Sequence, residues 1–576
     1  MGPLTGAEAR RSRLVAPAFA LAALATPGLI ALLTESAPQH MLLGVGLTAG
    51  LTSSLLVLYR WPSTRLALHL VLLSVPLELF YRLVYRGAVS PGILLSAAET
   101  NVRETSEMLA GHALATAFLL PVAALALYGF VFAWRADNPF SLRHCIRVCA
   151  VSALLVLASW AAGWQRSAVF ELADQLKQTF PFDIAHSFRV VVMGFIDTHN
   201  QAAARAAFAF PGVRMVDAAS RRDAPEIYVV VVGETSRRAN WSLFGYPRAT
   251  TPRLDAIRDD LVIVEHMTAN ATLTVLSVPL ALTRATPATW EIARSERSII
   301  SLLRQAGFSV LWISNQEHFG RRANPVSAIA LEASSVSFPE DTHAGIRQDY
   351  TRDGVGPGGF DSNLLDRLQV ALAQVPTNGK IVVFLHMIGS HFAYHDRYPK
   401  NFEAFRGTVN APRALPAPQL RLLNEYDNSV YFTDYVVRSA IDQLAARGGM
   451  AALLYFSDHG ERLFDDGLTE HDLGHGFPTV SRQEIEIPYF LWLSNGYQAA
   501  HPALVARLRA NARSPAELDS LFETIVDLAG IEYDRRDKAR SLLSEAFRAP
   551  QALEVLNTEE QPLFLTLGDV GDAEQH

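Results

Sequence analysis

Residues 227–238 of the 576-residue chain read IYVVVVGETSRR, and they indicate how its second half folds. Its uninterrupted apolar run, 227–232, predicts a strand buried on both faces, as in the middle of a parallel sheet. Gly233, Glu234 and Thr235 follow at once. A carboxylate directly after so buried a strand is unusual, and the polar residues that follow the other apolar runs help to explain its position.

Further apolar runs follow the first, separated by longer amphipathic segments. The runs are FSVLWIS (308–314), KIVVFLHM (380–387), AALLYFS (451–457) and IPYFLWL (487–493). Helical spacing is clearest over 362–374 and 426–446. This alternation predicts an α/β domain over residues 225–555, built on a mostly parallel central sheet.

Polar residues follow most of these runs. In open α/β sheets the ligand site lies beyond the carboxyl ends of the strands, so residues far apart in sequence meet there. We expect this convergence for Glu234, Asn315, His391, Asp458 and His459. The carboxylate after the first strand is then explained, because the strand exit is the rim of a site.

The residue types at these strand ends favour a metal site. Asp458 and His459 are adjacent, and carboxylate with imidazole suits Zn²⁺ or Mn²⁺ better than Mg²⁺. Taken singly, each residue has an ordinary explanation: Asp458 as a helix cap, Glu234 as a first-turn acid, and a histidine as a surface or core residue. Their coincidence at strand ends favours the metal.

A candidate nucleophile lies in TANATLTVLSVP, residues 268–279. A hydroxyl beside a divalent cation is activated to attack phosphorus, although hydroxyl residues are also common in ordinary polar loops. The candidates are Thr268, Thr272, Thr274 and Ser277. The chain has neither a GxxxxGK[ST] nor a GxSxG motif, which disfavours a P-loop NTPase and a standard α/β-hydrolase.

The first third of the chain is membrane-like. Its apolar stretches, 14–34, 41–59, 66–84, 112–134 and 148–163, are each near the ~20 residues that a helix needs to cross a bilayer. Arginines flank them in the pattern that places the start of the chain inside and everything after the fifth stretch outside. Few ionisable residues interrupt the stretches, which favours an anchor over a transporter.

These patterns divide the chain. We expect a five-helix transmembrane domain (1–164), amphipathic bridging helices (165–224), the α/β domain (225–555) and an acidic, disordered tail (556–576). A net charge of −7 argues against a nucleic-acid partner. Cys145 and Cys149 are the two cysteines, and their place in the membrane part excludes a disulfide framework in the outer domain.

Longer blocks carry a family resemblance. GETSRRANWSLFGYPRATTPRL (233–254) resembles the signature of bacterial phosphoethanolamine transferases, members of the alkaline phosphatase superfamily alongside the sulfatases. Further blocks resemble that family in its order: NATLTVLSVP, FLHMIGSHFAYHDRYP, EYDNSVYFTDYVV, FSDHGERL and LGHGFP, with ETNVRETSE (99–107) in an outer loop. The resemblance implies an alkaline-phosphatase-like periplasmic domain on a multi-pass inner-membrane protein.

The resemblance also implies a reaction and its residues. The family transfers phosphoethanolamine from phosphatidylethanolamine, through a phosphothreonine-type ester, to an outer saccharide such as lipopolysaccharide core, lipid A or a glucan. Carried onto this chain, one zinc ion or two would be bound by Glu234, Thr272, Asp458 and His459, with Thr272 as nucleophile. His391 and His475 would serve the phosphate and its protons, and substrate contacts would include His386, His391, His475, Asn315 and Glu104.

Departures from the family pattern bear on the acceptor. Lipid A-modifying members have a glycine before the nucleophile and disulfides in the outer domain, whereas this chain has Ala271 there and no such cysteines. The chain is therefore more similar to members that modify core saccharides or glucans. Phosphoglycerol transfer onto periplasmic glucans is one alternative. A membrane-bound sulfatase-like hydrolase is another, although Ala281 stands where the C/S-x-P-x-R motif needs arginine.

Overall fold

The computed structural model describes two compact parts of the chain, residues 1–194 and 195–576. The described residues are 26, 62–84, 88–94, 117, 121–124, 146–147, 150, 154, 182–216, 225–316, 325–338, 359–465 and 472–566.

In the first part, helix α3 (Pro62–Val84) covers the third predicted membrane stretch. Arg82 near its end is buried and pairs with Glu78 and, at 2.7 Å, with Asp183 at the start of α9 (Phe182–Ala207). Helix α9 lies inside the predicted bridging segment. The other predicted membrane stretches fall almost wholly outside the described residues.

Within the described part of the chain, no helix combines the length and apolar character needed to cross a membrane. The five predicted spans therefore stay a prediction.

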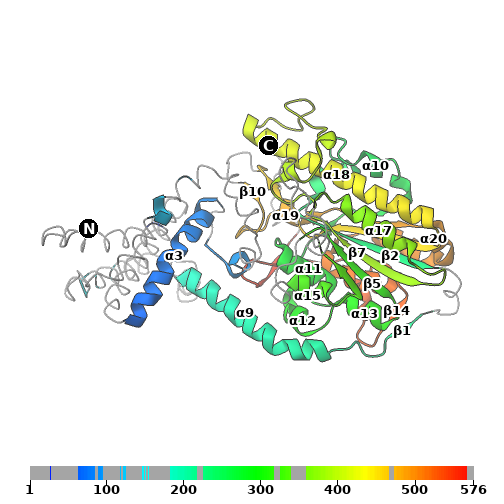
Figure 1. Cartoon of the computed structure of the whole chain (residues 1–576), viewed down its shortest axis with the longest axis horizontal. Helices are drawn as coiled ribbons and strands as arrows, with labels where there is room; N and C mark the ends of the chain where they lie inside the picture. Colours follow the sequence, from blue (N-terminus) through cyan, green and yellow to red (C-terminus); the bar gives the residue numbers. More distant parts are fainter. Residues whose placement is uncertain are drawn as a thin grey trace. The chain divides into compact units, whose positions relative to one another are not determined.

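The second part is built on a seven-stranded sheet of order β3-β12-β8-β2-β7-β5-β6 (Figure 1). Strand β2, the run quoted at the outset, is central and runs parallel to both β7 and β8. Strand β12 runs antiparallel to β8 and β3. The mostly parallel sheet is confirmed. The strand bounds are β2 Glu226–Gly233, β3 Leu261–Ile263, β5 Ser309–Ser314, β6 Ser335–Ser337, β7 Lys380–His386, β8 Met450–Ser457 and β12 Tyr489–Leu493.

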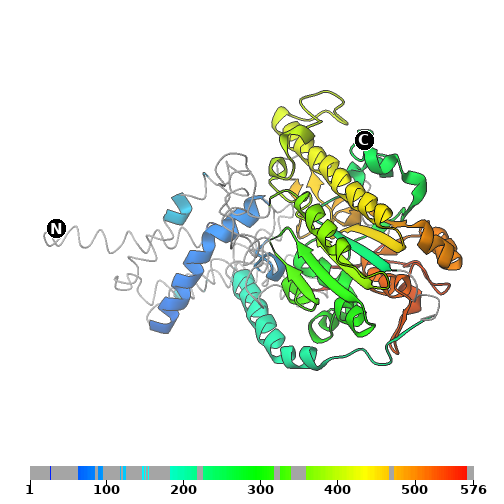
Figure 2. The ribbon, with the colours of Figure 1, turned by 45° about the vertical axis from the view of Figure 1, so that its right-hand side comes forward.

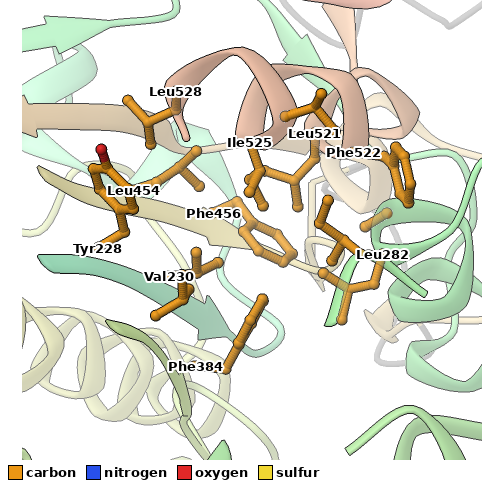
Figure 3. Packing of buried hydrophobic residues seen from close by; sticks show 14 of the residues in the cluster. Tyr228, Val230, Leu282, Phe384, Leu454, Phe456, Leu521, Phe522, Ile525 and Leu528 are labelled. Carbon is orange, nitrogen blue, oxygen red and sulfur yellow. The ribbon is translucent and has the colours of Figure 1, made fainter. Parts of the chain in front are cut away.

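Both faces of β2 are covered, which explains its unbroken apolar sequence. Tyr228 and Val230 point to the face packed by α11 (Thr274–Leu282) and α22 (Leu521–Leu528), as Figure 3 shows. The intervening residues Ile227, Val229 and Val231 face α17 (Asn363–Ala373) and α18 (Ala417–Arg447). These two helices lie side by side over the sheet (Figures 1 and 2). The result is a three-layer α/β/α core.

Short elements complete the second part. The remaining helices are α10 Pro252–Asp255, α12 Glu291–Ser295, α13 Ile299–Gln305, α15 Pro325–Ala330, α19 Arg482–Ile485, α20 Asn495–Ala500 and α21 Pro502–Asn511. Small sheets pair β1 Arg214–Met215 with β14 Ile531–Glu532, β9 Arg462–Leu463 with β10 Leu473–Gly474, and β4 Met267–Thr268 with β11 Glu486–Ile487 and β13 Ala516–Glu517.

The C-terminal segment differs from the prediction. Instead of a disordered acidic tail from residue 556, strands β15 (Leu553–Leu556) and β16 (Pro562–Leu565) form an antiparallel hairpin. Leu553 and Val555 are buried against Ile485, and this apolar contact holds the hairpin on the domain. The acidic residues of this C-terminal segment lie in the turn between β15 and β16 and in residues 567–576. Residues 567–576 are outside the described residues.

Candidate active site

Three of the predicted metal ligands converge at the carboxyl end of the sheet. Strands β2 and β8 are parallel neighbours in which Gly233 pairs with Ser457, so the next residue of each strand leaves the sheet beside the other. One ligand atom from each of Glu234, Asp458 and His459 lies within 4.8 Å of the others, and all three residues are buried. This confirms the predicted convergence of these three, which we call the triad.

Hydrogen bonds orient the triad towards a shared point. His459 Nδ1 donates to the carbonyl of Gly460 at 2.8 Å, so Nε2 faces the carboxylates, 3.4 Å from Asp458 Oδ2 and 3.7 Å from Glu234 Oε1. Asp458 Oδ2 is buried and accepts no hydrogen bond from the described residues. An imidazole held in this tautomer beside a buried carboxylate oxygen without a hydrogen bond fits a zinc-type cation.

The charges of the triad are strongly coupled. Burial would raise the pKa of Glu234, but the imidazoles of His459 and His391 outweigh burial and lower it to about 2. Burial raises the pKa of Asp458 to about 7, with a further contribution from Glu234. Burial lowers the pKa of His459, but Asp458 and Glu234 outweigh it and raise that pKa. A cation bound at the triad would compete with protons for these groups.

The hydroxyl at the triad belongs to Thr274 rather than Thr272. Thr274 Oγ1 donates to Glu234 Oε1 at 3.1 Å and lies 3.3 Å from His459 Nε2. Thr272 is buried, and in the described structure no hydrogen bond joins its hydroxyl to the triad. Thr274 is the first residue of α11, where unpaired N–H groups and the helix dipole favour negative charge. The hydroxyl nearest the triad is thus two residues beyond the predicted Thr272, and the nucleophile's identity stays a proposal.

Ser277, another candidate hydroxyl, is fully buried and donates to the main-chain carbonyl of Asp458 at 2.6 Å. It fastens α11 to the metal-ligand loop. A serine committed in this way does not suit a nucleophile, and this weakens the sulfatase-like alternative.

His391 and His475 lie beside the triad, as predicted. The ring of His475 is 4.2 Å from that of His459 and 6.3 Å from that of His391. His391 Nδ1 donates to the carbonyl of Phe392 at 2.8 Å, which leaves its Nε2 for proton exchange. Burial and the two neighbouring histidines lower the pKa of His475, so its imidazole is neutral.

Sequence reasoning missed the residues that hold His475. Its Nδ1 lies 2.6 Å from Oε2 of Glu461, and Oε1 of that carboxylate accepts a hydrogen bond from Tyr394. Burial raises the pKa of Glu461 to about 7. Glu461 stands in the SDHGER block, so its place three residues after Asp458 was a signal that could have found it.

Asn315 directly follows β5 and His386 ends β7, and their predicted contacts with substrate stay a prediction. Asn315 Nδ2 donates to Gly359 and Asp361, and His386 Nδ1 lies 3.1 Å from the Ser314 hydroxyl. Both residues are buried. Each supports the loop that follows its strand, while Asn315 Oδ1 and His386 Nε2 are buried without a hydrogen-bond partner in the described part of the chain. The remaining predicted contact, Glu104, lies outside the described residues.

Thr235 shows how tightly the loop after β2 is fixed. Its φ of 54° lies in the left-handed region, where a threonine is strained. Its N–H donates to Asp458 Oδ1 at 3.0 Å, and its hydroxyl donates to Glu234 Oε1 at 2.7 Å. Both triad carboxylates are therefore bonded to this one residue.

Comparison with known proteins gives the class to which this fold and site belong. Residues 226–531 match the model of the Sulfatase family. This match covers more than half of the chain, and the chain belongs to that family.

Individual relatives narrow the class to phosphoethanolamine transferases. Phosphoethanolamine transferase EptC of Escherichia coli (strain K12) is 27% identical over 486 residues, which cover 82% of this chain and 80% of that protein. The resemblance to phosphoethanolamine transferases is thereby confirmed, and so is the prediction of an enzyme. The narrower similarity to members that modify core saccharides or glucans stays a prediction.

Solved structures agree with this assignment. The C-terminal periplasmic domain of EptC from Escherichia coli, in complex with Zn, is 28% identical with a TM-score of 0.55, covering 63% of this chain and 98% of that one. The integral membrane protein lipooligosaccharide phosphoethanolamine transferase A (EptA) from Neisseria meningitidis has a TM-score of 0.71 at 20% identity, covering 94% of this chain and 97% of that one. The second likeness concerns the fold.

Proposed function

We propose that this chain is a zinc-dependent phosphoethanolamine transferase in which Thr274 carries the transferred group. The observation that supports this most directly is the Thr274 hydroxyl, 3.1 Å from Glu234 Oε1 and 3.3 Å from His459 Nε2. The proposed donor is phosphatidylethanolamine, and the proposed acceptor is lipopolysaccharide core, lipid A or a periplasmic glucan. The proposed location is a bacterial inner membrane, with the catalytic domain in the periplasm.

The zinc site would be formed by Glu234, Asp458, His459 and the oxygen of Thr274. When bound, zinc supplies a Lewis acid that lowers the pKa of a neighbouring hydroxyl and neutralises charge on phosphoryl oxygens. The chain adds its own stabilisation, because the N-terminus of α11 favours an oxygen anion at Thr274. Glu234, which accepts the hydrogen bond from Thr274, is 2% exposed, whereas Thr274 itself is half-buried and open to a substrate.

The first half-reaction forms a bond between Thr274 Oγ1 and phosphorus, after that hydroxyl has lost its proton to solvent. The bond from phosphorus to the diacylglycerol oxygen breaks. His391, in its protonated form, gives the Nε2 proton to this leaving oxygen, and the neutral His475 lies beside that histidine. The products are diacylglycerol and a phosphoethanolamine ester on Thr274.

The second half-reaction restores the enzyme. An acceptor hydroxyl attacks phosphorus, and its proton passes to the histidine that gave one up earlier. The bond from phosphorus to Thr274 breaks, and the threonine leaves as the oxygen anion from which the cycle began. Protons and charges therefore balance over one turnover, with a lipid headgroup moved to a saccharide.

The test is the intact mass of the purified, zinc-loaded full chain after incubation with phosphatidylethanolamine vesicles and no acceptor. Thr274→Ala is compared with Thr272→Ala, a matched control two residues away. We expect wild type and Thr272→Ala to gain one phosphoethanolamine unit, and Thr274→Ala to gain none. An adduct on Thr274→Ala, or its loss with Thr272→Ala alone, would overturn the assignment of the nucleophile.

The same experiment separates the alternatives. An adduct formed from phosphatidylglycerol but not from phosphatidylethanolamine would replace the proposed function with phosphoglycerol transfer. Lipid turnover without any adduct, in wild type as in the variants, would indicate a hydrolase.

A further inference from the structure

The C-terminal hairpin lies against the segment that carries Thr274. The main-chain N–H of Leu556 in β15 donates to the carbonyl of Asn270 at 2.7 Å. The next residue, Ala271, forms a parallel bridge with Leu556. Asn270, Ala271 and Leu556 are all almost completely buried. Strand β15 thus pairs, through Leu556, with the segment that directly precedes α11.

The side chain of Asn270 strengthens the same junction. Its Nδ2 donates to the carbonyl of Glu554 at 2.8 Å, and its Oδ1 accepts from the N–H of Asp519 at 2.7 Å. One buried amide therefore joins the segment before Thr274 to the hairpin and to the turn after β13. Removing either partner of a buried hydrogen bond leaves the other unsatisfied, so this junction resists displacement.

The hairpin also supports the metal-ligand loop. Leu553 and Val555 pack on Ile485 of α19. From that segment, the carbonyl of Glu484 accepts a hydrogen bond of 2.7 Å from the N–H of Gly460, which directly follows His459. The carbonyl of Ile485 accepts a second, also 2.7 Å, from Ala269 on the nucleophile segment. The loop after β8 and the segment before Thr274 are therefore both hydrogen-bonded to residues 484–485, on which the hairpin packs.

We propose that the β15–β16 hairpin is a clamp that sets the spacing between the Thr274 hydroxyl and the triad, with Asn270 as its positioning residue. This inference rests on the proposed function, because the reaction whose rate the hairpin affects is the proposed transfer. Its geometry rests on the contacts described above. The hairpin lies beyond residue 531, where the match to the Sulfatase family ends. The hairpin touches no reacting atom itself.

The clamp makes a specific kinetic prediction. The rate of a reaction between positioned groups depends strongly on the distance between them. A misplacement of about 1 Å lowers the rate by on the order of 100-fold. Asn270→Ala should therefore lower the rate constant for adduct formation by about 100-fold. The half-saturating phosphatidylethanolamine concentration and the zinc content should stay at their wild-type values. Leu556→Pro, which removes the N–H that bonds to Asn270, should act in the same direction.

The experiment uses the full zinc-loaded chain with three variants: Asn270→Ala, Leu556→Pro and Phe564→Ser. Phe564 is the control, since it lies on β16 with 61% of its surface exposed. Adduct formation is timed by intact mass, and hydrogen exchange is followed in peptides covering 270–276 and 457–461. We expect Phe564→Ser to match wild type, and both junction variants to form adduct slowly and to exchange faster at 270–276.

Adduct formation at the wild-type rate in both junction variants would overturn the clamp. A rate loss accompanied by equal loss of zinc and a general rise in exchange would also overturn it, because the hairpin would then act on the fold as a whole. Failure of the proposed function is distinguishable: wild type itself would give no adduct. Hydrogen exchange at 270–276 would still decide the clamp, which fails if the variants and wild type exchange alike.

Discussion

The side-chain amide of Gln316 donates one hydrogen bond to Oε2 of Glu234, at 3.1 Å, and a second to the carbonyl of Met387, at 2.7 Å. Both amide hydrogens are thus used, and the carboxylate is held through its Oε2 atom. Its other oxygen, Oε1, accepts from Thr235 and Thr274. Gln316 therefore determines which oxygen of Glu234 is presented to a cation.

Replacing Gln316 by alanine should weaken zinc binding. Loss of an outer partner of a metal ligand costs about 10–100-fold in affinity, since the ligand is no longer held in its binding orientation. Competitive zinc titration of the purified chain measures the change. Gln498→Ala is the matched control, because that amide bonds to Leu493 at the opposite end of the sheet. Equal zinc affinity in the two variants would refute the role.

Zinc affinity should fall with decreasing pH. Burial raises the pKa of Asp458 to about 7, and the two carboxylates raise the pKa of His459. A cation must displace protons from these groups, so protonation competes with binding below pH of about 7. For each proton displaced, the apparent dissociation constant should rise about tenfold per pH unit. Zinc titrations at about pH 8 and about pH 6 measure the slope, and a constant affinity would contradict it.

Ser277→Ala should retain the chemistry and lose stability. The Ser277 hydroxyl donates to the carbonyl of Asp458, and its removal leaves that buried acceptor unsatisfied, at a cost of about 1–3 kcal/mol. Urea unfolding measures the loss, and adduct formation by intact mass should persist. A sulfatase-like enzyme that used residue 277 in catalysis would instead lose all turnover in this variant.

The sequence predicted the sheet well because its central strands are covered on both faces. The apolar runs that became β2, β5, β7 and β8 are short and end in polar residues, and this length and setting favour a buried strand over a helix. Helices α17 and α18 likewise followed from their periodicity. The convergence of Glu234 with Asp458 and His459 followed from topology alone, since neighbouring parallel strands end at the same edge.

The details that sequence could not give depend on local geometry. Thr272 and Thr274 both precede Pro279 closely, and the choice between them depends on where α11 begins. The sequence predicted Asn315 at the site, but Gln316 is the residue that bonds to Glu234. Which of the two side chains reaches Glu234 depends on how the chain turns after β5. The C-terminal hairpin was missed because acidic residues surround its two short apolar strands, whose contacts with Ile485 and Asn270 are remote in sequence.

The family-like block at 233–254 makes a stability prediction, because its polar residues form a buried network on α18. Asp427 accepts hydrogen bonds from Asn240, from Tyr246 at 3.0 Å and from Arg248 at 2.6 Å. The side chains of Arg248 and Asp427 are 1% and 0% exposed. Asp427→Ala leaves the arginine charge buried without its partner, which should cost about 3–5 kcal/mol in the free energy of unfolding.

Urea unfolding of the variant measures this cost against an exposed ion pair on the same helix. Arg438 and Asp442 are 28% and 57% exposed, so Asp442→Ala should change the free energy of unfolding by less than about 1 kcal/mol. Equal costs for the two variants would contradict the buried network. Replacing Arg248 and Asp427 together by Met and Leu should recover much of the stability, because both desolvated charges are then removed and none is left unpaired.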